Sequence, residues 1–373
     1  MTHCPRFDTP AGKAQSLLIQ AIYDNSIEGV RFALDHGADL RIPAPMEKRA
    51  LSFDCGPGPR PTSIFCLALL NNCSFQIIEC LLPFADPLVP DVDGTTPLML
   101  AAHHFSPEAV AALLPISDID AVDKDGCDAL MNIFGFFGYK AQDEAAVLEC
   151  VDLFVKSGAS FHRRDSSGRT AFLQSVRRES SAVACRLIPH SDVSLRDNFG
   201  ANALILALNA GQEQTAIALL GVVDPLARDI DGRDAASLAA SRPLGAFLPL
   251  LLAECPAALE RGPEEPTLLM IAASAQCPTT VEFLIPLCDP KAAGLDGADA
   301  FMIAIEQHKV PGSDACALLL LPHADLSLVD ALGESALDKA RMRGLDDIAE
   351  AIEDRIIADA PPVLRTLPAR RSF

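Results

Sequence analysis

The sequence predicts an all-α solenoid of stacked helix–turn–helix repeats joined by extended, hairpin-like turns. Three observations predict it: glycines recur at a nearly constant spacing, two apolar runs follow each such glycine, and aliphatic residues far outnumber aromatic ones. Half of the 373 residues are hydrophobic, yet only 18 are Phe, 2 are Tyr and none is Trp. Small aliphatic side chains favour closely packed helices over a β-sandwich. A period of about 20 to 50 residues is typical of solenoids and propellers.

A turn of the form Asp-x-x-Gly opens most repeats. Consecutive turn glycines lie 32, 42, 32, 32, 65 and 36 residues apart. The interval of 65 corresponds to two repeats, with Glu265 at the glycine position between them. The intervals of 42 and 36 each correspond to one repeat with an insertion. An aspartate three residues before glycine accepts backbone N–H groups in a tight turn, and glycine supplies a positive φ. The turn glycines are Gly94, Gly126, Gly168, Gly200, Gly232, Gly297 and Gly333.

Two helices are expected after each turn. The first apolar run, as in residues 96–102, starts with Thr or Asn as N-cap, and Pro97 stands at the first helical position, where its missing N–H costs nothing. The second run ends in Leu-Leu-Pro or a variant, as in residues 113–118, and the proline stops the helix. Each repeat therefore predicts two helices of about eight to ten residues.

These motifs resemble the ankyrin repeat. The first half matches best at residues 91–102 (Asp-Val-Asp-Gly-Thr-Thr-Pro-Leu-Met-Leu-Ala-Ala), and the second half at residues 34–39 (Leu-Asp-His-Gly-Ala-Asp). The resemblance covers about residues 13–358, in about ten degenerate repeats of 32–33 residues. It implies binding of a partner through a concave groove lined by hairpin tips and first-helix ends. The histidine of the family motif is absent, which removes a hydrogen-bonding side chain from the helix start; Met99, Met131, Ile205, Met270 and Met302 stand there.

The register divides the chain into a lead-in (residues 1–12), a repeat solenoid (13–358) and a C-terminal tail (359–373) that is expected to be flexible. The last helices, expected at 336–340 and 346–358, are charge-rich, as suits a cap whose outer face meets water. A long loop at residues 42–61 is rich in Pro and Gly, and either a solvated insertion or a partner-binding loop accounts for it. A further insertion falls at about residues 134–143.

The formal net charge of −20 disfavours binding to nucleic acid or to an anionic membrane. No signal peptide and no membrane span are recognisable, so a cytoplasmic protein is expected, with signal-independent secretion left open. The twelve cysteines include no Cys-x-x-Cys pair, which favours buried thiols in a reducing compartment over a metal or redox site. We expect no cofactor and no metal.

The sequence also predicts a non-enzymatic protein. It contains no nucleophile elbow, zinc-protease motif or phosphate-binding loop. The repeats account for nearly all of the chain, and Asp pairs such as Asp123/Asp125 and Asp229/Asp231 belong to turns.

An arginine-rich band marks a candidate binding surface. Residues 156–261 contain 12 Lys+Arg and 11 Asp+Glu, whereas the remainder contains 18 and 39. Arg164, Arg196 and Arg228 each precede a turn Asp at intervals of 32, so a column on neighbouring hairpin tips is expected. The column is either a groove for an acidic or phosphorylated segment or a row of Arg–Asp pairs that bridge tips, at about 0–1 kcal/mol each. The same surface includes Arg169 and Arg233 after turn glycines, and Arg177, Arg178 and Arg242 at first-helix ends.

Aromatic and histidine residues extend this candidate surface. Phe134, Phe136, Phe137 and Tyr139 lie in or beside the second insertion, and form either an exposed patch typical of binding hot spots or a structural packing cluster. His103 and His104 occupy a groove position, without the spacing or carboxylates of a metal site.

The expected function is that of a monomeric scaffold or adaptor that binds a partner protein, with an acidic segment, through the groove. Two alternatives stay open. One is a bacterial secreted effector that targets a host protein, and the other is an acidic inhibitor or immunity-type protein that masks a basic toxin or enzyme.

Overall fold

The computed structural model describes residues 10–42, 63–91, 93–134, 144–177, 181–243, 245–262, 265–307 and 314–359. Within these ranges twenty α-helices follow one another in ten pairs, and the only β-structure is an isolated bridge between Val329 and Ser335. The predicted all-α repeat fold is confirmed. The chain separates into two compact units, an N-terminal unit (Met1–Phe199) and a C-terminal unit (Gly200–Phe373).

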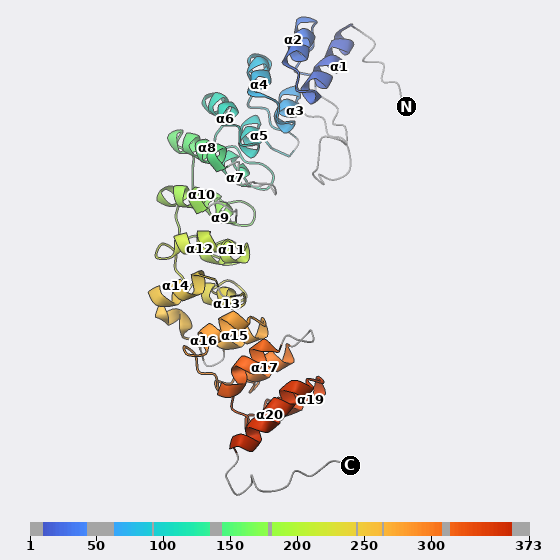
Figure 1. Cartoon of the computed structure of the whole chain (residues 1–373). Coiled ribbons are helices and arrows are strands. Elements are labelled where there is room, and N and C mark those ends of the chain that lie inside the picture. Colours follow the sequence, from blue (N-terminus) through green and yellow to red (C-terminus); the bar gives the residue numbers. More distant parts are fainter. Residues whose placement is uncertain are drawn as a thin grey trace. The chain divides into compact units, whose positions relative to one another are not determined.

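In the N-terminal unit the helices form two rows (Figure 1). The first helices of the pairs pack on one another in succession, and so do the second helices. The first helices are α1 (Pro10–Tyr23), α3 (Ile64–Leu70), α5 (Pro97–His103), α7 (Ala129–Asn132) and α9 (Ala171–Ser175). The second helices are α2 (Ile27–Asp35), α4 (Phe75–Leu81), α6 (Pro107–Leu113), α8 (Glu144–Lys156) and α10 (Ser181–Leu187).

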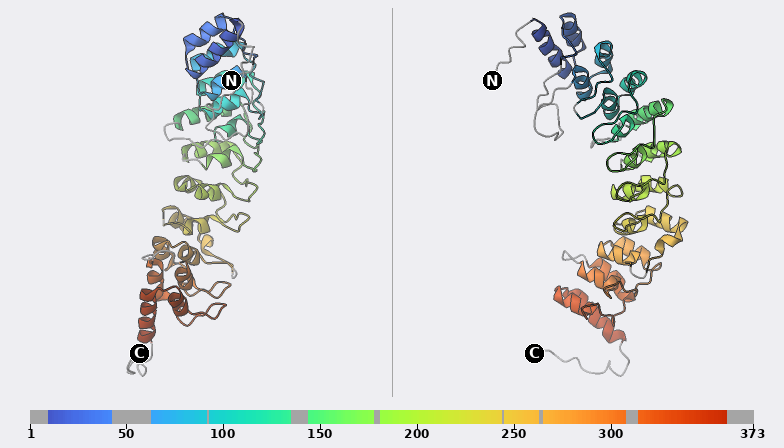
Figure 2. Two further views of the ribbon diagram at one scale, coloured as in Figure 1. Left: turned by 90° about the vertical axis from the view of Figure 1, so that its right-hand side faces the viewer. Right: turned by 180° about the vertical axis from the view of Figure 1, so that it is seen from behind.

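The C-terminal unit repeats the arrangement, as the views of Figure 2 show for each unit. Its first helices also pack in succession, while α12 packs on α14 and α16 on α18. The first helices are α11 (Ala203–Asn209), α13 (Ala235–Ala240), α15 (Leu268–Ser274), α17 (Ala300–Glu306) and α19 (Ala336–Met342). The second helices are α12 (Glu213–Leu219), α14 (Phe247–Glu254), α16 (Pro278–Leu284), α18 (Ala315–Leu320) and α20 (Asp346–Asp359).

The core lies between the two rows and along the first helices. In α11 every residue from Ala203 to Leu208 is buried, and within the unit α12 and α13 pack on this helix. Such a helix is apolar all round, whereas α6 buries only Ala109, Val110 and Leu113 along one stripe. No described helix is both long and apolar enough to cross a membrane.

Most helices span seven residues and are shorter than expected. The second helices end before the Leu-Pro-x segment, as predicted, but the chain then continues into a 3₁₀ turn that contains the proline, as in η2 (Leu82–Phe84) and η3 (Leu114–Ile116). Proline fits there because a first-turn N–H has no helical partner. The first helix begins at Pro10, three residues before the expected start of the solenoid.

The Asp-x-x-Gly turns form as predicted. In the turn of Asp165, one carboxylate oxygen accepts the N–H groups of Ser167 and Arg169, each at 2.8 Å, and Gly168 has a φ of +76°. The helix starts differ from expectation in one respect. At α5, the N–H of Thr96 donates to the Sδ of Met99 at 3.3 Å, so this methionine sulfur accepts a hydrogen bond at a helix start where the sequence predicted the loss of a hydrogen-bonding side chain.

Ten cysteines fall in the described ranges, and all are free thiols. Five of them are buried, and burial raises the pKa of Cys73 to about 11 and that of Cys150 to about 12. These thiols behave as small apolar side chains of the core.

Candidate functional site

The arginines of the N-terminal unit's hairpin tips bind their own chain. The Nε of Arg164 donates to the carbonyl of Gly168 at 2.7 Å, and its Nη2 donates to the carbonyl of Arg196 on the next tip. The Nε of Arg169 pairs with the buried Asp165 at 3.1 Å. Arg164 and Arg196 therefore lie on neighbouring tips, as the 32-residue spacing predicts, and Arg164 connects them.

The same pattern occurs in the C-terminal unit. Arg228 pairs through both Nη atoms with Glu265, and its Nη2–Oε2 distance is 2.8 Å. This hydrogen bond raises the pKa of Arg228 and lowers that of Glu265. Arg233 pairs with Asp229 at 2.9 Å and with Asp231 at 2.8 Å. Such half-exposed pairs contribute about 0–1 kcal/mol each to stability.

The arginines at first-helix ends differ from those at the tips. Arg177 follows α9, is exposed, and its guanidinium makes no hydrogen bond or ion pair with the residues that the structure describes. Burial and the neighbouring charge of Arg169 lower its pKa. In the C-terminal unit, Arg242 is half-buried and makes a long hydrogen bond of 3.4 Å to the carbonyl of Asn209. Arg178 lies outside the described residues.

His103 and His104 close α5, with their rings edge to face and their centroids 5.1 Å apart. Burial lowers the pKa of His104, which keeps this imidazole neutral at pH 7. Within the described ranges no three His, Cys, Asp or Glu side chains are placed to hold a metal ion.

Phe134 does not belong to an exposed aromatic patch. This residue is 5% exposed, and its N–H donates to the carbonyl of Met131 at 2.9 Å, so it continues the turn of α7 and packs in the core. Its ring is therefore not available to a partner. Phe136, Phe137 and Tyr139 lie outside the described residues.

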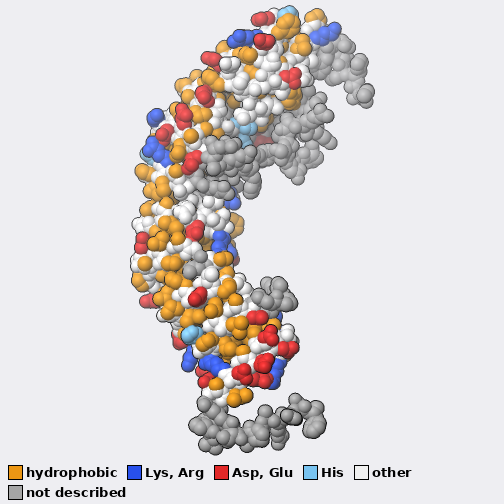
Figure 3. Space-filling model, in the orientation of Figure 1, with side chains coloured by type: hydrophobic (Ala, Val, Ile, Leu, Met, Phe, Trp, Pro, Cys, Tyr) orange, Lys and Arg blue, Asp and Glu red, His pale blue; other side chains and the backbone are white. Residues whose placement is uncertain are grey.

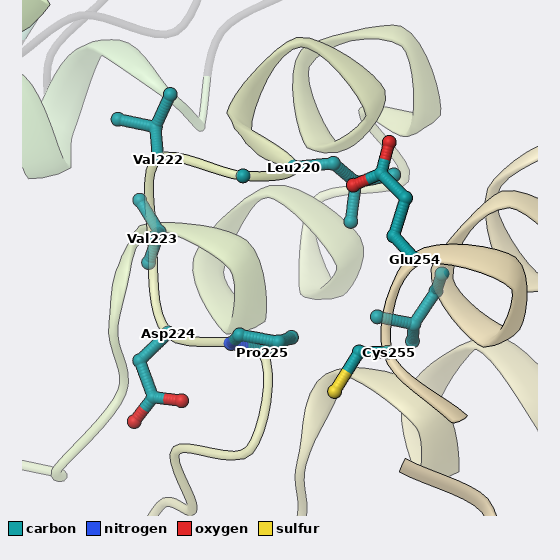
Figure 4. A pocket seen from close by; sticks show the side chains of 9 residues that line it. Leu220, Val222, Val223, Asp224, Pro225, Glu254 and Cys255 are labelled. Atoms are coloured by element: carbon teal, nitrogen blue, oxygen red, sulfur yellow. The ribbon is translucent and has the colours of Figure 1, made fainter. Parts of the chain in front are cut away.

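One recess in the C-terminal unit was not predicted from the sequence. A pocket of about 290 Å³ lies between the loop after α12 and the end of α14 (Figure 4). Leu220, Leu251 and Pro225 line it, and Glu254 and Cys255 lie at its edge. Ligand pockets span about 300–1,000 Å³, so this recess lies at the lower limit of that range. It forms from two consecutive repeats, and no motif within one repeat marks it.

Stacked helix pairs joined by hairpin-like turns define an all-α repeat solenoid. The family model of the ankyrin repeat matches residues 93–124, which hold α5 and α6, so this part of the chain is similar to an ankyrin repeat. Ankyrin repeats generally mediate protein–protein interactions and are typically non-enzymatic. No curated protein matches the chain.

Proposed function

We propose that this chain is a non-enzymatic scaffold or adaptor that binds an acidic segment of a partner protein, with Arg177 as the charged contact of its N-terminal unit. The proposal rests on which arginines already have a hydrogen-bond partner within the chain. The guanidinium groups of the tip residues and of Arg242 donate to groups of the chain itself, and Arg196 also has a partner within the chain. The guanidinium of Arg177 has none among the described residues.

An exposed guanidinium without a hydrogen-bond partner among the described residues can bind a ligand at low energetic cost. Arg177 breaks no hydrogen bond to a described residue when it binds, and it offers two parallel N–H donors to a carboxylate or phosphate. An arginine already bonded to an aspartate, such as Arg233, has to exchange one partner for another. The first-helix ends, with His103 and His104 two pairs earlier in the same row, then supply further polar contacts on a rigid surface.

The test combines capture with two arginine variants. The tagged chain captures its partner from an extract of the source organism, mass spectrometry identifies the partner, and calorimetry with the purified partner gives the affinity. We expect Arg177→Ala to weaken binding about tenfold, as for a contact worth about 1.4 kcal/mol, and Arg177→Glu to weaken it further. Arg233→Ala is the matched control and leaves the affinity unchanged. Wild-type affinity in Arg177→Glu contradicts the proposal.

The two alternative functions predict different effects of these variants. A delivered effector uses the same binding face, so the same variants apply and a secretion assay distinguishes it. An acidic inhibitor that masks a basic protein requires an acidic face, so its affinity is insensitive to Arg177 and falls when carboxylates are neutralised.

A further inference from the structure

We propose that the N-terminal unit carries a second docking surface, for a basic amphipathic segment of a partner protein. The surface consists of five apolar side chains in two consecutive loops, Phe84, Leu88, Val89, Ile116 and Val122, and is called the loop surface here. It is separate from Arg177 and carries the opposite charge preference.

The five side chains are between 42% and 61% exposed. Single exposed apolar residues are normal, but a contiguous group on a protein surface marks an interaction site. Phe84 and Ile116 hold the same position in consecutive pairs, because each is the last residue of the 3₁₀ turn after the second helix.

The two loops lie side by side. They follow α4 and α6, which pack on each other, and packed helix axes are about 8–10 Å apart. Where the loops end, the N–H of Lys124 donates to the carbonyl of Asp93 at 2.9 Å. Gly94 also approaches the backbone of Asp123 so closely that an added Cβ would lie 3.3 Å from its Cα. The apolar side chains of both loops therefore share one face of the unit.

The surroundings of the loop surface are acidic. Between Arg60 and Lys124 the sequence contains eight Asp and Glu residues and no Lys or Arg. Figure 3 shows hydrophobic and acidic side chains together over the part of the unit that holds α4 and α6. Of the cations that follow in the chain, Lys124 pairs with Asp93 at 3.1 Å and Arg163 with Asp120 at 3.2 Å, whereas Lys156, at the end of α8, is exposed.

Two carboxylates are fixed within the loops themselves. Asp86 accepts the N–H of Leu88, and Asp118 accepts the N–H of Asp120, each at 3.0 Å. Both carboxylates are exposed, and Glu79 on α4 adds a third exposed charge. A rigid apolar surface bordered by fixed negative charge is complementary to a segment that alternates aliphatic side chains with Lys or Arg. It repels nucleic-acid phosphates and anionic lipid headgroups.

The experiment uses a fluorescein-labelled Leu/Lys amphipathic peptide, and a Leu/Glu peptide of the same pattern, with the full chain. Fluorescence anisotropy measures the affinity. One test variant, Phe84→Ser with Ile116→Ser, removes apolar area. The other, Asp86→Asn with Asp118→Asn, removes charge but keeps the side-chain oxygen that holds each loop. The matched controls in the C-terminal unit are Leu332→Ser, at a side chain 80% exposed, and Asp224→Asn, whose oxygen accepts the N–H of Leu226 at 3.0 Å.

We expect the Leu/Lys peptide to bind and the Leu/Glu peptide to fail. Each double variant at the loop surface weakens binding about tenfold, which corresponds to about 1.4 kcal/mol, while circular dichroism shows an unchanged fold. The two control variants bind like wild type. Failure of the wild-type chain to bind the Leu/Lys peptide, or equal losses in test and control variants, overturns the proposal. Its failure leaves the Arg177 proposal standing, because the two experiments share neither residue nor ligand.

Discussion

At the scale of single residues, the turn glycines are alike in backbone but not in surroundings. Gly168 and Gly232 have φ values of +76° and +73°. A Cβ added to Gly168 would lie 2.9 Å from the backbone N of Asn198 on the next tip, whereas nothing lies within 4 Å of one added to Gly232. Positive φ therefore explains the glycine at both sites, and close approach of neighbouring tips explains it additionally at Gly168.

This pair of glycines separates the two effects by mutation. Gly232→Ala costs about 1–2 kcal/mol of unfolding free energy, because a side chain in the left-handed region is strained. Gly168→Ala costs about 1–3 kcal/mol more, because the backbone of the next tip has to move. Urea unfolding of both variants measures the difference. Equal losses in the two variants would show that the approach of Asn198 does not restrain the turn.

At the residue scale, contacts within a turn could be predicted from the sequence, whereas contacts between neighbouring tips could not. The Asp and Gly of each turn were predictable, because their partners lie within four residues. The role of Arg228 was not, since its partner Glu265 lies 37 residues away and their contact depends on how neighbouring tips align. The spacing of 32 residues placed the arginines on the tips but left open whether they bind the chain or a partner.

At the scale of helices, the N-caps of the first helices carry buried aspartates in three pairs. The carboxylate of Asp234 pairs with Arg261 at 2.7 and 3.0 Å, and Asp128 lies 3.7 Å from Arg163. Asp299, 1% exposed, caps α17 by accepting the N–H of Met302, but its second oxygen is buried and has no hydrogen-bond partner among the residues that the structure describes. Burial raises the pKa of Asp299 above its ordinary value.

We therefore expect Asp299→Asn to stabilise the chain at neutral pH by about 1 kcal/mol, the contribution of one satisfied hydrogen bond. Asn202 supports this, because at the same position of α11 it caps the helix and donates to the carbonyl of Asp224 at 2.8 Å. Because the pKa of Asp299 is raised in the folded state, the stability that its carboxyl contributes is complete below its unfolded pKa and is lost as the pH rises through its folded pKa. The stabilisation by Asp299→Asn should therefore vanish near pH 4. Thermal unfolding at several pH values measures this stabilisation. A stabilisation that does not depend on pH contradicts the argument.

Helix starts were easier to predict from the sequence than helix ends. Thr96, Asn202 and Thr267 were expected as N-caps, and each accepts a backbone N–H three residues on. The ends were misjudged in length, because proline stops an α-helix but is accommodated in the first positions of a 3₁₀ turn. For Phe134 the sequence left open an exposed patch or structural packing, and the structure shows packing, since α7 ends at Asn132 while its turn continues through two more residues.

At the scale of the whole molecule, repeats are stabilised by their neighbours, so the contacts between consecutive pairs decide how firmly each pair is held. In addition to the packing of α19 on α17, one buried cation links the C-terminal pair, α19 and α20, to the preceding pair. Lys339 of α19 is 3% exposed and contacts Glu306 at the end of α17, Asp330 at 2.6 Å and Glu334 at 3.6 Å. Burial alone would lower the pKa of Lys339, but its hydrogen bonds to Asp330 and Glu306 raise it; the bond to Lys339 lowers the pKa of Asp330.

Replacement of this cation should release the C-terminal pair selectively. Lys339→Met leaves three carboxylates together without a counter-charge, and removal of one partner from a buried ion pair costs about 3–5 kcal/mol. Hydrogen exchange followed by mass spectrometry should show lost protection in α19 and α20, with α11 unchanged. Lys291→Met, at an exposed lysine of the same unit, is the matched control and leaves protection as in wild type.

The pH dependence of this protection distinguishes charge from packing. In the wild type the contribution of Lys339 is complete below its ordinary pKa of 10.5 and is lost as the pH rises above it, while that of Asp330 is complete above 3.8 and is lost as the pH falls below it. Protection of α19 and α20 is therefore constant across neutral pH. In Lys339→Met the clustered carboxylates repel one another and bind protons more readily, so protection should rise as the pH falls from 7 toward 4. A variant whose protection is low and independent of pH over this range would show that the lysine acts through the packing of its stem and not through its charge.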